Sequence, residues 1–332
     1  MPTDTDYMLK CLSLARRGRK WVSPNPMVGA VLVKNGEIIA SAYHSHFGGL
    51  HAEAKVLKKA GQKAKGATLY VNLEPCVHHG KTPPCVDAII AAGVKKVVVG
   101  SLDPNPLVNG KGVRKLRQAG VLVAVGTRRG ACVQLNRKFF KYIETGLPWV
   151  TLKLAQTADG FIAQKNGFSK WITGPRAGRF VHELRAEHDA ILVGANTVIA
   201  DDPHLTLHGV KGRQPWRVVL DSKGRIPRDA RVLNDKFKDR TLILANCRDA
   251  IKRVPTELAQ QNISSILVEG GAQVADSFLK AGLIDEFYLF TAPQKFGEGL
   301  KTFADEKLLK DFKVVEKGKI GPDLLQVMTR HN

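Results

Sequence analysis

Hydrophobic and polar positions in the first part of the chain alternate between patterns typical of helices and of strands. Apolar residues at helical spacing predict a first helix that Asp4 can cap and that ends at the basic run 16–20. Asn35-Gly36 separates strand patterns at 27–33 and 37–43, which predicts a β-hairpin because this turn needs positive φ at both central positions. Helices are predicted at 52–60, 86–92 and 113–119, and strands at 68–73, 94–99 and 121–125. This order predicts an α/β/α sandwich with a partly parallel sheet.

A second α/β pattern follows a break at residues 145–148. Gly146 and Pro148 end a helical pattern over 129–144. Strands at 150–156 and 161–163 flank Asp159-Gly160 and predict a second hairpin. Further strands are predicted at 190–193, 217–220, 242–245, 265–268 and 286–290, and helices near 176–187 and 273–281. Because single hydrophobic cores stop growing near about 250 to 300 residues, we expect two domains in this 332-residue chain, 1–146 and 147–332.

Composition narrows the class of protein. A hydrophobic fraction of 44% and a charged fraction of 24% are those of an ordinary globular chain. The acidic start and the lack of a run of about 18 apolar residues predict a cytoplasmic protein with neither a secretory signal nor a membrane span. The net charge is +21, of which +15 lies before Leu147, and it favours anionic partners: nucleic acid, a membrane surface or phosphorylated small molecules.

Five cysteines make an odd and sparse set, for which ligand or catalytic roles are favoured over disulfides. His51 opens a predicted helix, Cys76 follows a strand, and Cys85 opens the next helix. One imidazole and two thiolates leave a fourth tetrahedral position open, as in a catalytic zinc site. Each of these sequence features alone is commonly a chance feature of a protein surface or core. Their occurrence together predicts a zinc site. Cys11, Cys132 and Cys247 are expected to be structural.

Glu53 lies two residues from the predicted ligand His51. Zinc lowers the pKa of bound water towards about 7. A carboxylate that is not itself a ligand can carry the proton from that water to a departing amine, and this combination is the signature of zinc deaminases. We therefore predict hydrolytic deamination with Glu53 as the catalytic proton shuttle.

Eight residues separate the two cysteines, whereas nucleic-acid deaminases have two. Residues 74–85 match the pattern E-P-C-x-H-x-G-[KR]-T-x-P-C throughout, and the chain here resembles the bifunctional deaminase–reductases of riboflavin biosynthesis. Segments 23–29 and 103–106 agree with that family. The resemblance implies a cytidine-deaminase-like α/β/α sandwich followed by a dihydrofolate-reductase-like α/β domain.

The first domain would then hydrolyse the 2-amino group of a diaminopyrimidinone that carries a ribosylamino 5-phosphate. By the resemblance His51, Cys76 and Cys85 bind zinc and Glu53 shuttles the proton. The substrate contacts that it implies are His44, Asp103 and Asn105. By their side-chain chemistry, Asn25 can donate to and accept from a pyrimidine edge, and Lys81 suits a phosphate. Ordinary turn chemistry explains Asn25 and the Asp103-Pro104-Asn105-Pro106 run about as well, and Lys81 fits a solvated loop.

The second half has no G-x-G-x-x-G after a strand, so a Rossmann fingerprint is absent. Instead a V-E-G-G turn at 268–271 runs from a strand into a helix, where backbone N–H groups can approach a pyrophosphate. The reductase domain of the same family carries this turn and implies NADPH as cofactor, with hydride delivered to C1 of the ribose to give a ribityl chain. Its implied NADPH contacts are Ala155, Trp171, Thr197, Asp201, Ser222, Gly271, Ala272 and Gln273. Its implied substrate contacts are Ser169, Arg185, Leu205 and Glu269, and His208 stands at a further position of this set. Lys153 is our own candidate for binding the ribose or the phosphate, and capping of an edge strand is the alternative.

His208 stands where the family pattern usually has an arginine. Lys211 and Arg213 lie close in sequence and are the alternatives for supplying that charge. A nucleic-acid deaminase or a nucleic-acid-binding protein would also explain the basic excess, but the cysteine spacing and the Glu53 constellation argue against them. We expect a phosphorylated pyrimidine as substrate, no nucleic-acid or membrane partner, and a homodimer or higher homo-oligomer.

Overall fold

The computed structural model describes residues 2–78, 83–165, 172–245, 251–303 and 306–330. The chain forms two compact units, Met1–Gly146 and Leu147–Asn332. Four residues singled out in the sequence lie outside the described residues: Lys81, Ser169, Trp171 and Cys247. Within the described ranges, every helix is too short or too polar to cross a membrane.

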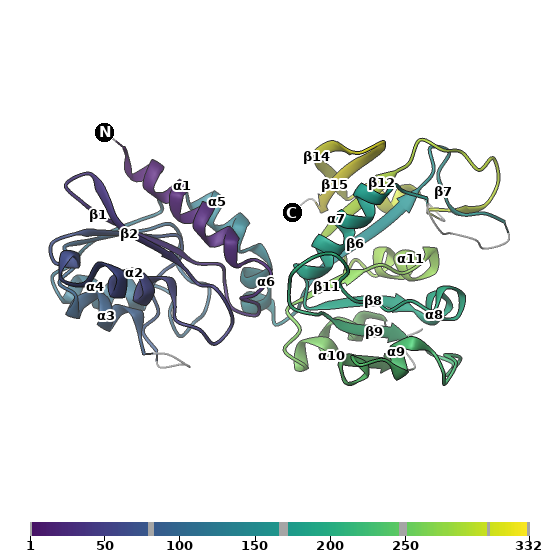
Figure 1. Cartoon of the computed structure of the whole chain (residues 1–332), viewed down its shortest axis with the longest axis horizontal. Coiled ribbons are helices and arrows are strands. Elements are labelled where there is room, and N and C mark those ends of the chain that lie inside the picture. The colour runs from purple at the N-terminus through teal and green to yellow at the C-terminus, as the bar shows by residue number, and fades with distance from the viewer. Residues whose placement is uncertain (1, 79–82, 166–171, 246–250, 304–305, 331–332) are drawn as a thin grey trace. The chain divides into compact units, whose positions relative to one another are not determined.

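The first unit is built on a mixed sheet whose described strands have the order β2-β1-β3-β4-β5 (Figure 1). Strand β1 pairs antiparallel with β2 and β3, whereas β3, β4 and β5 are parallel. Asn35 and Gly36 have φ of 52° and 80°, so the predicted hairpin is confirmed. The strands are β1 Gly29–Lys34, β2 Glu37–Tyr43, β3 Thr68–Val71, β4 Lys96–Val99 and β5 Leu122–Val125.

Helices cover both faces of this sheet. Alternate strand residues point to opposite faces, so Val31 and Val33 pack with α1 and α5, while Leu32 packs with α2, α3 and α4. The α/β/α sandwich predicted from the sequence is thus confirmed. The helices are α1 Asp4–Ala15, α2 Ala52–Ala60, α3 Cys85–Ala91, α4 Lys111–Gln118, α5 Arg129–Leu135 and α6 Arg137–Thr145, and the 3-10 turns are η1 Arg16–Gly18 and η2 Gly61–Ala64.

Two helix predictions in this unit need correction. Thr3, not Asp4, caps α1, because its hydroxyl and backbone form a capping box with Asp6. The helix expected over 129–144 breaks at Asn136 into α5 and α6. The buried Asn136 side chain accepts from Met27 N at 2.8 Å and donates to Met27 O at 3.0 Å, so it ties the break to the segment before β1.

The second unit contains a sheet whose described strands have the order β10-β9-β8-β11-β6-β12-β15-β14 (Figure 1). The strands β10, β9, β8, β11, β6 and β12 run parallel to one another. Strands β15 and β14 follow at one edge of the sheet, and β15 is antiparallel to both of its neighbours. They are β6 Trp149–Gln156, β8 Ala190–Gly194, β9 Trp216–Leu220, β10 Thr241–Leu244, β11 Ser265–Val268, β12 Glu286–Thr291, β14 Phe312–Ile320 and β15 Asp323–Arg330. The sequence analysis did not predict the hairpin of β14 and β15.

Helices also cover both faces of the larger sheet. Leu192 packs with α10 and α11 on one face, and its neighbour Ile191 packs with α8 and α9 on the other. Helix α7 packs on Phe290 and the β15 residues Leu325 and Val327. The helices are α7 Pro175–Ala186, α8 Ala195–Asp201, α9 Arg231–Asn234, α10 Val254–Gln260 and α11 Ala272–Lys280, and the 3-10 turns are η3 Lys238–Arg240, η4 Ile251–Arg253 and η5 Glu306–Leu309.

The hairpin expected around Asp159-Gly160 is wrong. The turn forms, with Gly160 at φ 81°, but β7 (Phe161–Ala163) pairs with β13 (Leu300–Lys301) in a separate small sheet. Strand β6 is bonded on one side to β11 and on the other to β12. Strand β12 pairs with β6 up to Gln156, beside the turn, whereas β11 pairs only with residues 149–152. One edge of β6 next to the turn is therefore taken by β12, and β7 pairs with β13 instead.

Candidate active sites

Three potential metal ligands meet at the N-terminal ends of two helices in the first unit. His51 is the N-cap of α2, Cys85 is the first residue of α3, and Cys76 lies in the loop after β3. His51 Nδ1 is 3.6 Å from Cys76 Sγ and 3.3 Å from Cys85 Sγ. Donors on one tetrahedral zinc lie about 3.5 to 3.8 Å apart, given its usual bond lengths. The donor set and its spacing therefore fit zinc.

The two thiols form a hydrogen-bonded pair in which Cys85 donates its proton to Cys76. A hydrogen bond from Cys85, together with the Cys85 backbone N–H and His51, lowers the pKa of the Cys76 thiol to about 4 despite burial. The pKa of Cys85 is raised, because it is the donor in that pair and is buried. A cation bound between them would replace this proton and hold both sulfurs as thiolates.

Glu53 lies on α2 beside these ligands and is only 4% exposed. Burial, together with the nearby Cys76, raises the pKa of its carboxyl group to about 7. A carboxyl group with such a pKa can both accept and release a proton near neutral pH. The chemistry of the residue matches the proton-transfer role expected of it.

A cavity of about 230 Å³ opens beside these potential metal ligands, which are one imidazole and two thiols. His51, Glu53 and Cys76 line its inner end. Phe139 of α6 contributes an apolar wall that the sequence reasoning missed. The cavity is also lined by all the described residues that were expected to contact the pyrimidine: Asn25, His44, Asp103 and Asn105.

His44 is held as a neutral ring in this cavity. Its Nδ1 lies 3.1 Å from the Leu50 carbonyl, to which it donates, so its Nε2 accepts from Asn25 Nδ2 at 3.1 Å. Burial lowers the pKa of His44 to about 4. The pair therefore offers neutral hydrogen-bonding groups, which suit the edge of a pyrimidine.

Glu74 organises the opposite wall, a role that the sequence reasoning did not assign. Its carboxylate is 3% exposed and accepts three backbone hydrogen bonds, from Asp103 at 3.3 Å, Gly110 at 2.9 Å and Val113 at 3.0 Å. Asp103 in turn accepts from Asn105 N at 2.8 Å. The available signal was the position of Glu74, directly before Pro75 and Cys76, at the end of a buried strand.

The described residues that were expected to bind NADPH lie in or after strands of the larger sheet, mostly at the carboxyl ends of the strands. Strands β8, β9 and β11 are parallel neighbours, so the segments that follow them meet at their carboxyl ends. Thr197 and Asp201 share a face of α8 at i and i+4 spacing. Gly271 caps α11, Ala272 and Gln273 form its first turn, Ser222 follows β9, and Ala155 lies in β6 beside the α7 core.

The starts of α8 and α11 lie against each other in a way that fits a dinucleotide. A Cβ added at Gly270 would come within 2.6 Å of Val274 Cβ, and one at Gly194 within 2.9 Å of Val274 Cγ2. Asn196 Nδ2 donates to Gln273 Oε1 at 3.4 Å between the two helices. At Gly271 a Cβ would meet nothing within 4 Å, so the N-terminus of α11 is open to an approaching phosphate.

Arg185 and Glu269 form a partly buried bidentate ion pair beside these strand ends. Arg185 Nε and Nη2 donate to the two Glu269 oxygens at 2.7 and 2.8 Å. Burial works to raise the pKa of Glu269, but Arg185 outweighs it and the pKa is lowered. The Lys153 ammonium acts on the same carboxylate, and burial lowers its own pKa. Three expected substrate residues thus form one charged cluster.

Two further residues that were expected to contact the substrate, Leu205 and His208, differ in their exposure. The Leu205 side chain is buried in the core with Ile191 and Val198, so any contact to substrate would have to come from its backbone. His208 is exposed, and its backbone N–H donates to His182 Nδ1 at 3.2 Å. His182 was missed, although it lies three residues before Arg185 on the predicted helix.

Arg213, one of the two bases expected to supply the charge of the family arginine, already has a carboxylate partner in the structure. It forms an ion pair with the buried carboxylate of Asp189, which also accepts from the Ser264 hydroxyl at 2.6 Å. Breaking a buried pair leaves an uncompensated charge, so Arg213 is committed to this structural contact.

Comparison with known proteins places both units. Residues 148–326 match the RibD C-terminal domain family, and residues 1–101 match the cytidine and deoxycytidylate deaminase zinc-binding region. Riboflavin biosynthesis protein RibD of Aquifex aeolicus is 47% identical over 90% of this chain and 89% of its own length. For RibD of Escherichia coli the identity is 42% over 97% of this chain and 98% of its own.

Solved structures agree over the full length. RibD of Acinetobacter baumannii is 37% identical, with a TM-score of 0.92 over 99% of both chains. A diaminohydroxyphosphoribosylaminopyrimidine deaminase/5-amino-6-(5-phosphoribosylamino)uracil reductase of Thermotoga maritima is 38% identical, with a TM-score of 0.90 over 99% of both chains. These similarities confirm the family resemblance and the fold class inferred from the sequence.

Proposed function

Because the chain belongs to the RibD family, the bifunctional deaminase–reductases of riboflavin biosynthesis, we propose how its own residues divide the two reactions between residues 1–146 and residues 147–332. The first unit would deaminate 2,5-diamino-6-ribosylamino-4(3H)-pyrimidinone 5-phosphate. The second would reduce the ribosyl group of the product, giving 5-amino-6-ribitylaminouracil 5-phosphate. The observation that carries the proposal is that His51, Cys76 and Cys85 form one cluster of potential metal ligands, and that His51, Cys76 and Glu53 line one cavity.

In the first unit we assign the metal to His51, Cys76 and Cys85. When bound, zinc activates water for attack on the ring carbon that bears the amine. Glu53 takes a proton from that water and delivers it to the departing amine, a task that suits a buried carboxyl group with a raised pKa. Asn25, His44, Asp103 and Asn105 hold the pyrimidine in the cavity, and Lys81 is assigned to its phosphate.

In the second unit we assign NADPH to the strand ends that carry Ala155, Thr197, Asp201, Ser222 and the start of α11, together with Trp171. When bound, NADPH supplies the hydride. The start of α11 accepts the pyrophosphate. The charged cluster of Lys153, Arg185 and Glu269 holds the sugar phosphate and fixes C1 for attack, with Ser169, His208 and the backbone of Leu205 as further contacts.

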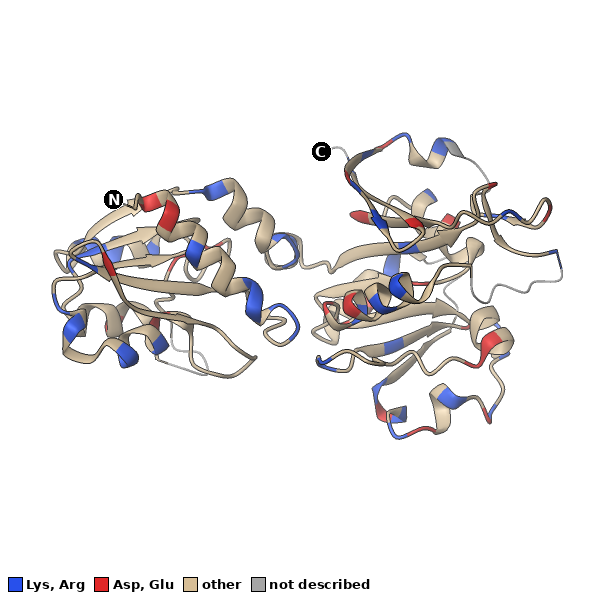
Figure 2. Cartoon of the chain, turned by 45° about the horizontal axis from the view of Figure 1, so that its top comes forward, with Lys and Arg blue, Asp and Glu red and all other residues tan. Residues whose placement is uncertain are grey.

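The surface of the protein bears on its partners, and its cysteines bear on its compartment. Figure 2 shows Lys and Arg on helices and loops of both units, which suits attraction of a phosphorylated substrate without a nucleic-acid partner. Strand β14 is an edge strand with exposed Val314 and Val315, which supports a homodimer or higher homo-oligomer. The free thiols of Cys11, Cys76, Cys85 and Cys132 suit the reducing cytoplasm.

The substitution Glu53→Gln tests the division of labour. The amide keeps the size of the side chain but cannot carry a proton, so we expect one bound zinc per chain, no ammonia release and unchanged NADPH oxidation with the deaminated pyrimidine. Glu37→Gln, at an exposed position of β2, is the matched control and should retain both activities. If a folded Glu53→Gln protein still releases ammonia at the parent rate, or loses both activities together, the assignment is wrong.

A further inference from the structure

The segment from Asp202 to His208 connects α8 to the loop before β9, and its backbone is strained. Asp202 and Leu205 have φ of 40° and 51°, in the left-handed region that non-glycine residues rarely adopt. Such conformations persist only where the surrounding structure holds them. Because the segment carries Leu205 and His208, whatever holds it bears on the reductase site.

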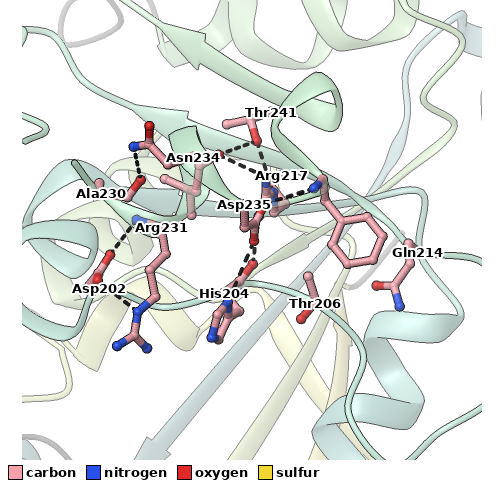
Figure 3. A network of polar contacts seen from close by, with 12 residues as sticks. Asp202, His204, Thr206, Gln214, Arg217, Ala230, Arg231, Asn234, Asp235 and Thr241 are labelled. Carbon is pink, nitrogen blue, oxygen red and sulfur yellow. Dashed lines mark hydrogen bonds and ion pairs between the residues drawn. The ribbon is translucent and has the colours of Figure 1, made fainter. Parts of the chain in front are cut away.

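Arg217, the second residue of β9, holds this segment from within the protein core (Figure 3). Its side chain is 0% exposed. Its guanidinium donates to Thr241 Oγ1 at 3.0 Å, Asp235 Oδ2 at 2.7 Å, the His204 carbonyl at 3.1 Å and the Val232 carbonyl at 2.9 Å. The donors of a guanidinium lie in one plane at set angles, so these contacts fix the His204 carbonyl relative to β9.

Stability alone does not explain a buried arginine at this position. Replacing a buried ion pair by well-packed apolar residues is often neutral or stabilising. The distinctive contribution of Arg217 is geometric, because its acceptors come from β10, α9, the loop after α9 and the strained segment. Asp202 adds a second anchor at the start of the segment, where it accepts from Arg231 N at 2.8 Å.

The other side of the same segment touches the reductase cluster. Two residues beyond His204, the Thr206 carbonyl accepts from Arg185 Nη1 at 3.1 Å. This is the guanidinium that also grips both oxygens of Glu269. Leu205, between the two carbonyls, is buried and left-handed, so it has little freedom to absorb a shift. A displacement of the His204 carbonyl therefore reaches Arg185 through very few bonds.

We propose that Arg217 is a positioning residue of the reductase site: by holding the His204 carbonyl it places the Thr206 carbonyl and so orients Arg185 toward the substrate. The proposal rests on the proposed function, since it takes Arg185 and Glu269 as substrate contacts. It assigns Arg217 no contact with substrate or cofactor.

The substitution Arg217→Lys tests the proposal in the full chain. A single ammonium keeps the charge opposite Asp235 but cannot serve all four acceptors. Loss of one charge-assisted contact corresponds to a factor of about 10 or more, so we expect the reductase KM for the deaminated pyrimidine to rise about 10-fold. The KM for NADPH and the rate of ammonia release should stay at parent values.

Thr241→Val is the matched control, because it removes an acceptor of Arg217 on the side away from the segment at nearly unchanged volume. We expect it to lower the melting temperature while leaving the KM for the pyrimidine unchanged. If both variants raise that KM equally, or if Arg217→Lys alters both KM values alike, Arg217 is only structural and the proposal is overturned. If Arg217→Lys does not fold, Arg217→Gln, which keeps only the two donors of an amide, carries the same expectation and the same refutation.

A third variant separates this inference from the proposed function. Arg185→Ala should raise the KM for the pyrimidine more than Arg217→Lys does. An unchanged KM in Arg185→Ala would remove Arg185 from the substrate site and overturn both ideas. A raised KM in Arg185→Ala with a parent value in Arg217→Lys would overturn the positioning role alone.

Discussion

Gly112, in the first turn of α4, leaves no room for a side chain next to the zinc-ligand loop. A Cβ at this position would lie 2.4 Å from the Pro75 carbonyl oxygen and 3.0 Å from Glu74 Oε1. An ordinary carbon–oxygen contact is about 3.3 Å, so Gly112→Ala must separate α4 from Pro75 by about 0.9 Å. Pro75 directly precedes Cys76, and metal-ligand distances tolerate only about 0.2 Å. We expect the variant to bind zinc more weakly.

The size of the effect follows from opposing contributions. Alanine is favoured over glycine inside a helix by about 1 kcal/mol, whereas overpacking costs about 1 to 3 kcal/mol. The free energy of unfolding should therefore fall by roughly 0 to 2 kcal/mol. Zinc affinity should fall about 10- to 100-fold, as is typical when the support of metal ligands is disturbed. Gly130→Ala, in α5, is the control, because a Cβ there meets nothing within 4 Å.

Zinc affinity is measured by titration against a competing chelator, together with ammonia release and thermal unfolding. Gly130→Ala should bind zinc like the parent and be slightly more stable. The reasoning is refuted if Gly112→Ala binds zinc as tightly as Gly130→Ala and deaminates with the same kcat/KM.

Two further predictions concern buried or hydrogen-bonded carboxylates. Glu74→Gln turns one acceptor toward the backbone N–H groups of Asp103, Gly110 or Val113 into a donor, so the KM for deamination should rise about 10-fold with zinc content kept, and an unchanged KM would contradict the assigned role. Asp159 accepts from the Thr157 hydroxyl and from backbone N–H groups that include Gly297, which lowers its pKa to about 2 from 3.8. Because the folded-state pKa is the lower one, its stabilisation is present above about pH 4 and is lost as pH falls toward 2. Asp159→Asn should therefore flatten the pH dependence of the unfolding free energy in this window, and equal slopes for parent and variant would contradict the assignment.

Local chemistry accounts for the parts of the fold that could be predicted. Asn35-Gly36 specifies its hairpin because the turn needs only the φ preferences of two adjacent residues. The turn at Asp159-Gly160 forms for the same reason, yet its second strand pairs with β13, a strand far away in sequence that the turn residues do not specify. The break at Asn136 depends on Met27, which is distant in sequence. Propensity within the helix could not reveal it.

Some residues of the candidate sites could likewise be predicted from local sequence, and others could not. The zinc ligands and Glu53 could be predicted because short motifs place them at the ends of recognisable elements. The role of Glu74 could not, since its partners lie 29, 36 and 39 residues away. His182 was missed because its link to His208 becomes visible only when α7 and the strained segment are brought together. Arg217 reads in sequence as one polar residue in an apolar strand, and only the fold reveals its four acceptors.

The anchoring of α2 and α3 has a consequence for how the enzyme acquires its metal. His51 and Cys85 begin these helices, whose residues Val56 and Ile89 are buried in one shared core cluster. The ligands are thus brought together by hydrophobic packing, unlike those of zinc fingers, whose folding free energy comes from the ion itself. We therefore expect the chain to fold before it binds metal, so that a chelator removes zinc and activity without denaturing the protein and added zinc restores both.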